Sequence, residues 1–133
     1  MRILITEDDF ASRRMMQRYL SDYGNCDIAV DGNEAVEAFI LSLEQKEPYD
    51  LIFLDIMMPR MDGRKALQSI RKIEHEHGIH HLNFVKVIMT TACEDSKNIM
   101  GAFREGCEAY LIKPVNRKKV LKEMAKLGLV VLA

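Results

Sequence analysis

The sequence has few cysteines and no motif built from them. Cys26, Cys93 and Cys107 are odd in number and show no CxxC spacing, so they support neither a disulfide framework nor a zinc knuckle. The apolar run Ile3 to Ile5 is too short for the core of a signal peptide, and the acidic run Glu7 to Asp9 soon follows it. We therefore expect no export signal, no membrane insertion and a location in the reducing cytoplasm.

The chain also lacks an excess of either charge, internal repeats, and linkers rich in glycine, serine or proline. Its 19 basic and 20 acidic residues give a net charge of -1, which predicts no direct binding of nucleic acid. Its 133 residues are expected to form one domain, with a core over about residues 1–128. Three roles stay open for the apolar tail 129–133. It could pack onto the core, mediate association with another protein, or lead into a longer chain that is truncated here.

Short apolar segments alternate with longer amphipathic ones. The short runs are typical of strands buried on both faces, and they cover residues 3–5, 27–30, 51–54, 85–89 and 109–112. Helical spacing predicts helices over about 10–23, 32–43, 63–77, 95–105 and 116–127. In the first of these, Met15, Met16, Tyr19 and Leu20 share one side and should face the sheet. Such alternation predicts a doubly wound α/β fold, whose ligands bind at the carboxyl ends of parallel strands.

Polar residues that suit phosphoryl chemistry follow four of the predicted strands. They are the acidic run Glu7 to Asp9, Asp55, the pair Thr90-Thr91, and Lys113 with Pro114. A parallel sheet would bring these sets to one edge, where the carboxylates would repel one another unless a hard cation such as Mg2+ held them. Lysine and threonine are donors that stabilise phosphoryl oxygens, and an aspartate can itself be the nucleophile.

These residues lie in blocks that resemble the signature of response-regulator receiver domains. The blocks cover residues 3–9, 54–63 (LDIMMPRMDG), 87–92 and 106–114, and the resemblance extends over essentially the whole chain. It implies a flavodoxin-like (βα)5 sandwich with five parallel strands in the order 2-1-3-4-5. It also implies a stand-alone, chemotaxis-regulator-like protein of a two-component system.

The resemblance assigns the metal and phosphorylation site by motif position. Asp55 is the expected phosphoacceptor. Glu7, Asp8, Asp55 and the backbone carbonyl of Met57 are expected to hold Mg2+, for which Mn2+ could substitute. Asp8 should bind the ion directly and Glu7 through water, whereas Asp9 falls one place past the acidic pair.

The resemblance also assigns the residues of a conformational switch. Thr91 is expected to be the switch hydroxyl and Tyr110 the switch aromatic residue. Lys113 should contact the acyl phosphate, and its peptide bond to Pro114 should be cis. Thr90, one residue before the switch hydroxyl, should face away from the site.

The implied function is signalling. A histidine kinase or a phosphotransfer protein would donate the phosphoryl group to Asp55, and the domain would catalyse only its own phosphoryl uptake and dephosphorylation. Movement of Thr91 and Tyr110 would then repack the surface of the fourth helix, fifth strand and fifth helix, where an unknown effector protein would bind. We expect a monomer that could dimerise on phosphorylation.

Three other interpretations were weighed against this one. An adaptor independent of phosphorylation would keep the fold, although every site residue is intact. An aspartate-nucleophile phosphatase would carry a DxD motif. In this chain Asp55 is followed two residues later by Met57, so the second acidic residue is missing. A flavodoxin-like nucleotide binder would need a phosphate loop after the first strand, where Glu7 to Asp9 would repel phosphate.

Histidines 75, 77, 80 and 81 match no zinc motif and are assigned no role.

Overall fold

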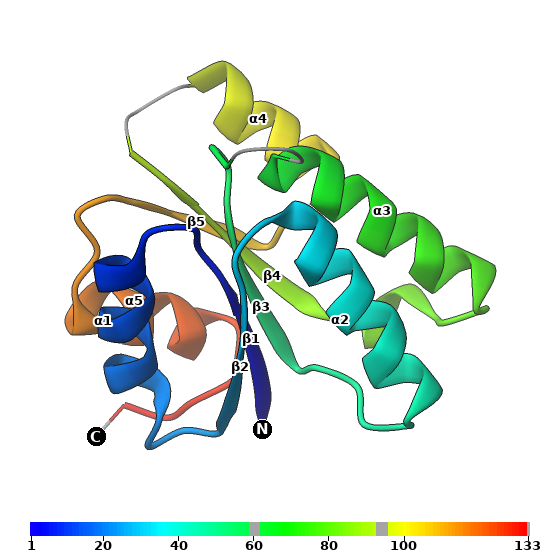
Figure 1. Ribbon diagram of the computed structural model, residues 1–133, viewed down its shortest axis with the longest axis horizontal. Coiled ribbons are helices and arrows are strands. Elements are labelled where there is room, and N and C mark those ends of the chain that lie inside the picture. The colour runs from blue at the N-terminus through cyan, green and yellow to red at the C-terminus, as the bar shows by residue number, and fades with distance from the viewer. Residues whose placement is uncertain (59–61, 93–95, 133) are drawn as a thin grey trace.

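The computed structural model describes residues 1–58, 62–92 and 96–132, with only the backbone described at 96–98. Strands and helices alternate along the chain (Figure 1). The strands are β1 (Arg2–Thr6), β2 (Asn25–Ala29), β3 (Leu51–Asp55), β4 (Lys86–Thr91) and β5 (Ala109–Ile112). The helices are α1 (Phe10–Leu20), α2 (Gly32–Glu44), α3 (Gly63–Glu76), the 3-10 helix η1 (His81–Asn83), α4 (Ser96–Arg104) and α5 (Arg117–Lys126).

Within the described ranges the strands form one parallel sheet in the order β2-β1-β3-β4-β5, as predicted. Helices α1 and α5 cover one face of the sheet, and α2, α3 and α4 cover the other (Figure 1). Alternation along each strand divides the core between the two faces. Ile3 and Phe53 pack toward α1 and α5, whereas Leu4 and Leu54 pack toward the opposite helices. This arrangement confirms the doubly wound α/β class.

Four helices begin with the same local interaction. The side chains of Asp9, Asp31, Asp62 and Asn116 each accept a hydrogen bond from a backbone N–H in the first turn of α1, α2, α3 and α5, respectively. An aspartate or asparagine at this position satisfies a backbone donor that the helix itself leaves unpaired. In α1 the cap lies three residues after the end of β1, so Glu7 and Asp8 are held in a short loop at the carboxyl edge of the sheet.

The boundaries differ from the prediction by a few residues. β4 continues to Thr91 because Thr90 pairs with Asp55 of β3 and Thr91 pairs with Ile112 of β5. α1 ends at Leu20 instead of residue 23, since the chain turns there toward Gly24 and a Cβ on Gly24 would meet the backbone of Met1. Residues 59–61 of the signature block, together with Cys93 and the predicted start of α4 at residue 95, lie outside the described residues.

The prediction that Met15 faces the sheet is wrong. Met16 and Leu20 are buried and Tyr19 packs partly against the same core, but Met15 is 42% exposed. Successive helical residues are about 100° apart, so a side chain next to the buried stripe can lie on its flank. Met15 occupies that flank and lines a cavity at the edge of the helix. In the described part of the chain, no helix is long and apolar enough to cross a membrane.

Candidate functional site

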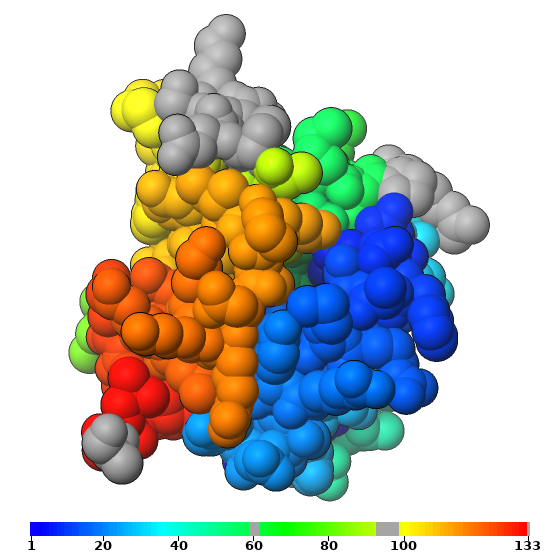
Figure 2. Space-filling view, turned by 90° about the vertical axis from the view of Figure 1, so that its left-hand side faces the viewer, coloured from blue at the N-terminus to red at the C-terminus, as the bar shows by residue number. Residues whose placement is uncertain are grey.

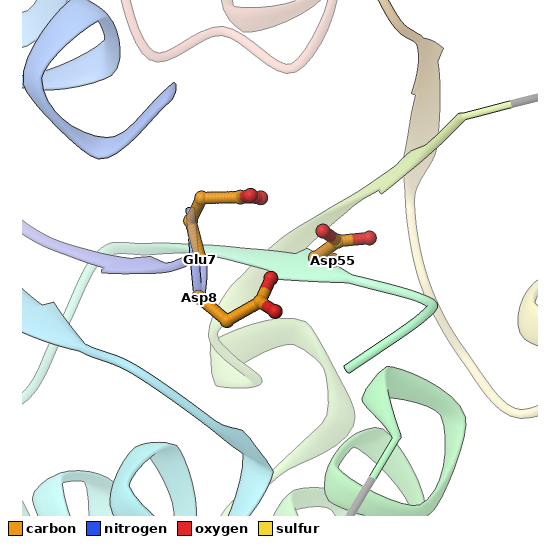
Figure 3. A group of neighbouring side chains, drawn as sticks. All are labelled: Glu7, Asp8 and Asp55. Carbon is orange, nitrogen blue, oxygen red and sulfur yellow. The ribbon is translucent and has the colours of Figure 1, made fainter. Parts of the chain in front are cut away.

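Three carboxyl groups meet at the carboxyl edge of the sheet. Glu7 and Asp8 follow β1 directly, and Asp55 is the last residue of β3, the strand beside it. Each of the three offers an oxygen atom within 4.8 Å of the others. Figure 3 shows the side chains of Glu7 and Asp8 extending toward Asp55. The edge thus concentrates negative charge, as the order of the strands requires.

Lys113 brings a positive charge to the same place from the end of β5. Its Nζ lies 2.7 Å from Oδ2 of Asp55 and 2.9 Å from Oε2 of Glu7. The Lys113-Pro114 peptide bond is cis, as predicted, and the backbone N–H of Lys113 donates to the carbonyl of Thr91 over 2.7 Å. Lys113 therefore links three strands through its ammonium group and its backbone.

The ionisation of this cluster reflects burial and close charges. Burial, reinforced by the neighbouring carboxylate of Asp55, raises the pKa of Glu7 from 4.5 to about 7, although Lys113 opposes the shift. Burial acts against the charge of Lys113, but its hydrogen bonds and charge interactions with Asp55 and Glu7 prevail and raise its pKa. A positively charged Lys113 is thus fixed between two carboxyl groups.

Asp9 has a different position from the two acidic residues before it. Its Oδ2 accepts the N–H of Ser12 over 2.8 Å, so it caps α1. The hydrogen bonds with Ser12 lower the pKa of Asp9, because they favour its charged form. Asp9 is not a member of the group formed by Glu7, Asp8 and Asp55. Asp9 is therefore a helix cap and lies outside the carboxyl cluster.

The loop after β3 is fixed tightly against the sheet. Oδ1 of Asp55 accepts the N–H of Met57 over 3.1 Å, and Gly63 donates its N–H to the carbonyl of Ile56. A Cβ on Gly63 would lie 2.2 Å from the carbonyl oxygen of Asp55, so only glycine fits this close approach. The side chain of Met57 is 66% exposed. Any contribution of Met57 to the site would therefore come from its backbone.

The two threonines at the end of β4 are both buried but lie on opposite faces of the sheet. Alternation places Thr90 on the face of Ile88, toward α1 and α5, and Thr91 on the face of Met89. Tyr110 pairs with Met89 in the β4-β5 register and is 37% exposed. Its ring meets that of Phe103 edge-to-face, with 5.6 Å between the centroids.

Two features of the site were missed from the sequence alone. Thr90 lines a cavity beside Lys113, and Phe103 contacts Tyr110 across the gap between α4 and β5. Strand alternation contains the signal for the first, since it places Thr90 on the face of α1 and α5. The second depends on the angle at which α4 packs, which no local pattern reports.

The donor set fits a hard divalent cation. Carboxylate oxygens are the ligands that Mg2+ prefers, and it usually keeps several waters beside one or two of them. Asp8 is exposed to solvent, whereas Glu7 and Asp55 are buried at the edge. The three residues could therefore hold a cation that remains open to solvent on one side.

The fold and this site define a flavodoxin-like α/β domain with an acidic, lysine-bridged edge. The family model of the response regulator receiver domain matches residues 3–125. The chain therefore belongs to the response regulator receiver domain family. Members of this family act as signalling domains of two-component phosphorelays, and this chain is a signalling domain of that kind.

Individual relatives agree with this assignment. The chemotaxis protein CheY of Treponema pallidum is 32% identical over 126 residues, which cover 93% of this chain and 80% of that protein. The probable histidine kinase 2 of Oryza sativa is 30% identical over 132 residues, which cover 92% of this chain. The chain spans only 12% of the length of that kinase.

Solved structures share the fold. A chain in the co-crystal of the Saccharomyces cerevisiae phosphotransfer protein Ypd1 with the receiver domain of Ssk1 gives a TM-score of 0.80 at 27% identity, covering 96% of this chain and 88% of that one. A chain in the CheX-CheY-BeF3-Mg2+ complex of Borrelia burgdorferi gives a TM-score of 0.79 at 26% identity, covering 96% of this chain and 88% of that one.

Proposed function

We propose that Asp55 accepts a phosphoryl group from a phosphohistidine of a histidine kinase or a phosphotransfer protein. The observation that carries this proposal is the position of Lys113, whose Nζ lies within 3 Å of both Asp55 and Glu7. The Ssk1 receiver was crystallised with a phosphotransfer protein, which supports a donor of this kind. We place the protein in the cytoplasm, where such donors act.

The transfer is a substitution at phosphorus. An oxygen of the Asp55 carboxylate forms a bond to phosphorus, the bond between phosphorus and the imidazole nitrogen breaks, and the imidazole leaves with the bonding electron pair. Lys113 lies 2.7 Å from Oδ2 of Asp55, so its charge offsets the negative charge gathered on the phosphoryl oxygens. Attack of water on phosphorus later restores the carboxylate and releases phosphate.

Glu7, Asp8, Asp55 and the backbone carbonyl of Met57 would hold Mg2+, with Asp8 as a direct ligand. Mg2+ supplies charge neutralisation for the phosphoryl oxygens, and Mn2+ would substitute because it also takes oxygen ligands. The CheY complex with Mg2+ and BeF3 supports this choice of cation. The exposed carboxylate of Asp8 leaves the open side through which a phosphodonor could approach.

We also propose that the surface of α4, β5 and α5 carries the output. A groove of about 470 Å³ lies there, lined by Phe103 and Tyr110 and by three lysines of α5, at positions 119, 122 and 126. Movement of the Thr91 hydroxyl toward an acyl phosphate would open space for the ring of Tyr110. The aromatic contact with Phe103 would then break and the groove would change shape.

Phosphoryl uptake from acetyl phosphate in Mg2+ buffer tests the acceptor, with intact mass and 31P NMR as readouts. Asp55→Asn should take up no phosphoryl group, because an amide is a poor nucleophile and lacks the charge that attracts the cation. Asp22→Asn, at an exposed position in the turn after α1, is the matched control and should react like the unmodified chain. Equal uptake by Asp55→Asn and the unmodified chain would disprove the acceptor.

The same experiment distinguishes a phosphoacceptor from an adaptor that acts independently of phosphorylation. An adaptor would show no uptake in the unmodified chain and no Mg2+-dependent change with beryllofluoride. The intact cluster of Glu7, Asp8, Asp55 and Lys113 favours the phosphoacceptor, since an adaptor would have no use for buried carboxylates around a lysine.

A further inference from the structure

A cavity beside the phosphorylation site has features of a ligand site. It has a volume of about 390 Å³ and lies between α1 and the loop that joins β5 to α5. These two elements lie side by side on the face shown in Figure 2, with α1 in blue and the β5-α5 segment in orange. Six of its eleven lining residues are apolar, at positions 5, 15, 16, 53, 114 and 115. A space of this size accommodates a small organic molecule.

The walls of the cavity are not uniform. Ile5 and Phe53 come from the interior of β1 and β3, whereas Glu7, Thr90 and Lys113 come from the carboxyl ends of their strands. The cavity is therefore apolar deep between sheet and helix and polar beside Asp55. Glu7 and Lys113 already bind each other at that polar end, so a ligand there would not need to carry a charge.

Thr90 presents a hydroxyl at the polar end of the cavity. It is only 6% exposed, and its side chain lies on the face of the sheet that borders the cavity. Among the described residues, no protein group forms a hydrogen bond with its hydroxyl. The hydroxyl itself is still accessible from the cavity, since the only fully enclosed side-chain oxygen without a partner among the described residues is that of Thr6. A ligand with one hydrogen-bonding group could therefore bond to the Thr90 hydroxyl.

We propose that this cavity binds small, uncharged aromatic molecules that carry one hydrogen-bonding group directed at Thr90. Aromatic rings suit the walls because methionine thioethers, here Met15 and Met16, and the ring of Phe53 make favourable contacts with them. The ligand would also lie against Lys113, the residue that holds Asp55. Its binding would therefore change the rate of phosphoryl uptake, a consequence that rests on the proposed function.

Indole and indene are suitable probes because they have nearly the same shape and only indole has an N–H donor. With the full chain labelled at its methionine methyl groups, indole should shift the NMR signals of Met15 and Met16. The signal of Met100 on α4 is the internal control and should not move, since it does not line the cavity. Indole should bind about tenfold more tightly than indene, the amount expected for one hydrogen bond.

Two variants locate the binding. Thr90→Val keeps the shape of the side chain and should remove the preference for indole over indene. Val115→Phe should fill the cavity and abolish the shifts caused by both probes. The proposal is overturned if indole leaves Met15 and Met16 unchanged, if it shifts Met100 equally, or if both variants bind indole as the unmodified chain does.

The regulatory consequence has its own measurement. Saturating indole should change the rate of acetyl phosphate labelling in the unmodified chain and have no effect in Val115→Phe. Binding without any change in labelling would disprove the coupling through Lys113. Absence of labelling with and without indole would refute the proposed acceptor, while the NMR shifts would still decide whether the cavity binds the probe.

Discussion

Arg64, in the first turn of α3, reaches across Gly101 of α4 and pairs with Glu105. Its Nη2 lies 2.6 Å from Oε1 and its Nε 3.3 Å from Oε2 of that carboxylate. A Cβ on Gly101 would lie 2.3 Å from Nη2 of Arg64, so the glycine leaves the space in which the guanidinium lies. Because Gly63, the residue before Arg64, packs against the backbone of Asp55, this pair joins the loop after β3 to the end of α4.

Gly101→Ala should uncouple this pair. A double-mutant cycle with Arg64→Ala and Glu105→Ala in the unmodified chain should give a coupling energy of about 1 kcal/mol, since the pair is bidentate and only partly exposed. In the Gly101→Ala background the coupling should fall to near zero, because the methyl group displaces the guanidinium. Denaturant unfolding measures both cycles, and an equal coupling energy in both would contradict the role of Gly101.

Asp8 and Asp9 should differ in what they contribute, although they are adjacent. Asp8→Ala should weaken Mg2+ binding by about tenfold or more, since it would remove the proposed direct ligand, with little effect on unfolding. Asp9→Ala should lower the free energy of unfolding through the lost cap of α1 and leave Mg2+ affinity nearly unchanged. Mg2+ titration and denaturant unfolding of both variants provide the crossed comparison. Equal Mg2+ affinities would remove the distinction.

Glu7 should make the stability of the Mg2+-free protein depend on pH. Its pKa is raised from 4.5 to about 7, so the folded chain binds this proton more tightly than the unfolded chain. The resulting stabilisation is fully present below pH 4.5 and is lost as the pH rises through 7. The loss should be at most about 3 kcal/mol. Urea unfolding measured across this pH range should show the loss of stability, and Glu7→Gln should flatten the pH dependence of the free energy of unfolding. An unchanged pH dependence in Glu7→Gln would show that a group other than Glu7 causes it.

Tyr110 should become buried when Mg2+ and beryllofluoride occupy the site. The driving force is a hydrogen bond from the Thr91 hydroxyl to an anionic acceptor, worth about 1.5–3 kcal/mol, which shifts a two-state equilibrium about tenfold to a hundredfold. NMR of ring-labelled tyrosine should show loss of the contact with Phe103, and Thr91→Val should abolish the change. Identical Tyr110 spectra with and without beryllofluoride would refute the switch without affecting the acceptor.

The sequence by itself determined the class of fold and the position of each site residue along the chain. Short apolar runs alternating with amphipathic segments admit few arrangements other than a parallel sheet covered on both faces, because every parallel strand needs a crossover. The acidic run after β1, Asp55 at the end of β3 and Lys113 after β5 then had to share one edge. The order of the strands came from the family resemblance, since periodicity does not contain it.

Tertiary structure alone decided how these residues pair and what lies beside them. Nothing local distinguishes Met15 from Met16, yet Met15 is 42% exposed and Met16 is buried, because the tilt of α1 over the sheet sets the boundary between them. The contact of Arg64 with Glu105 and that of Phe103 with Tyr110 join residues far apart in sequence or on different elements. Such contacts depend on the packing angles of α3, α4 and β5, which arise from side-chain volumes across the whole core and not from a local pattern.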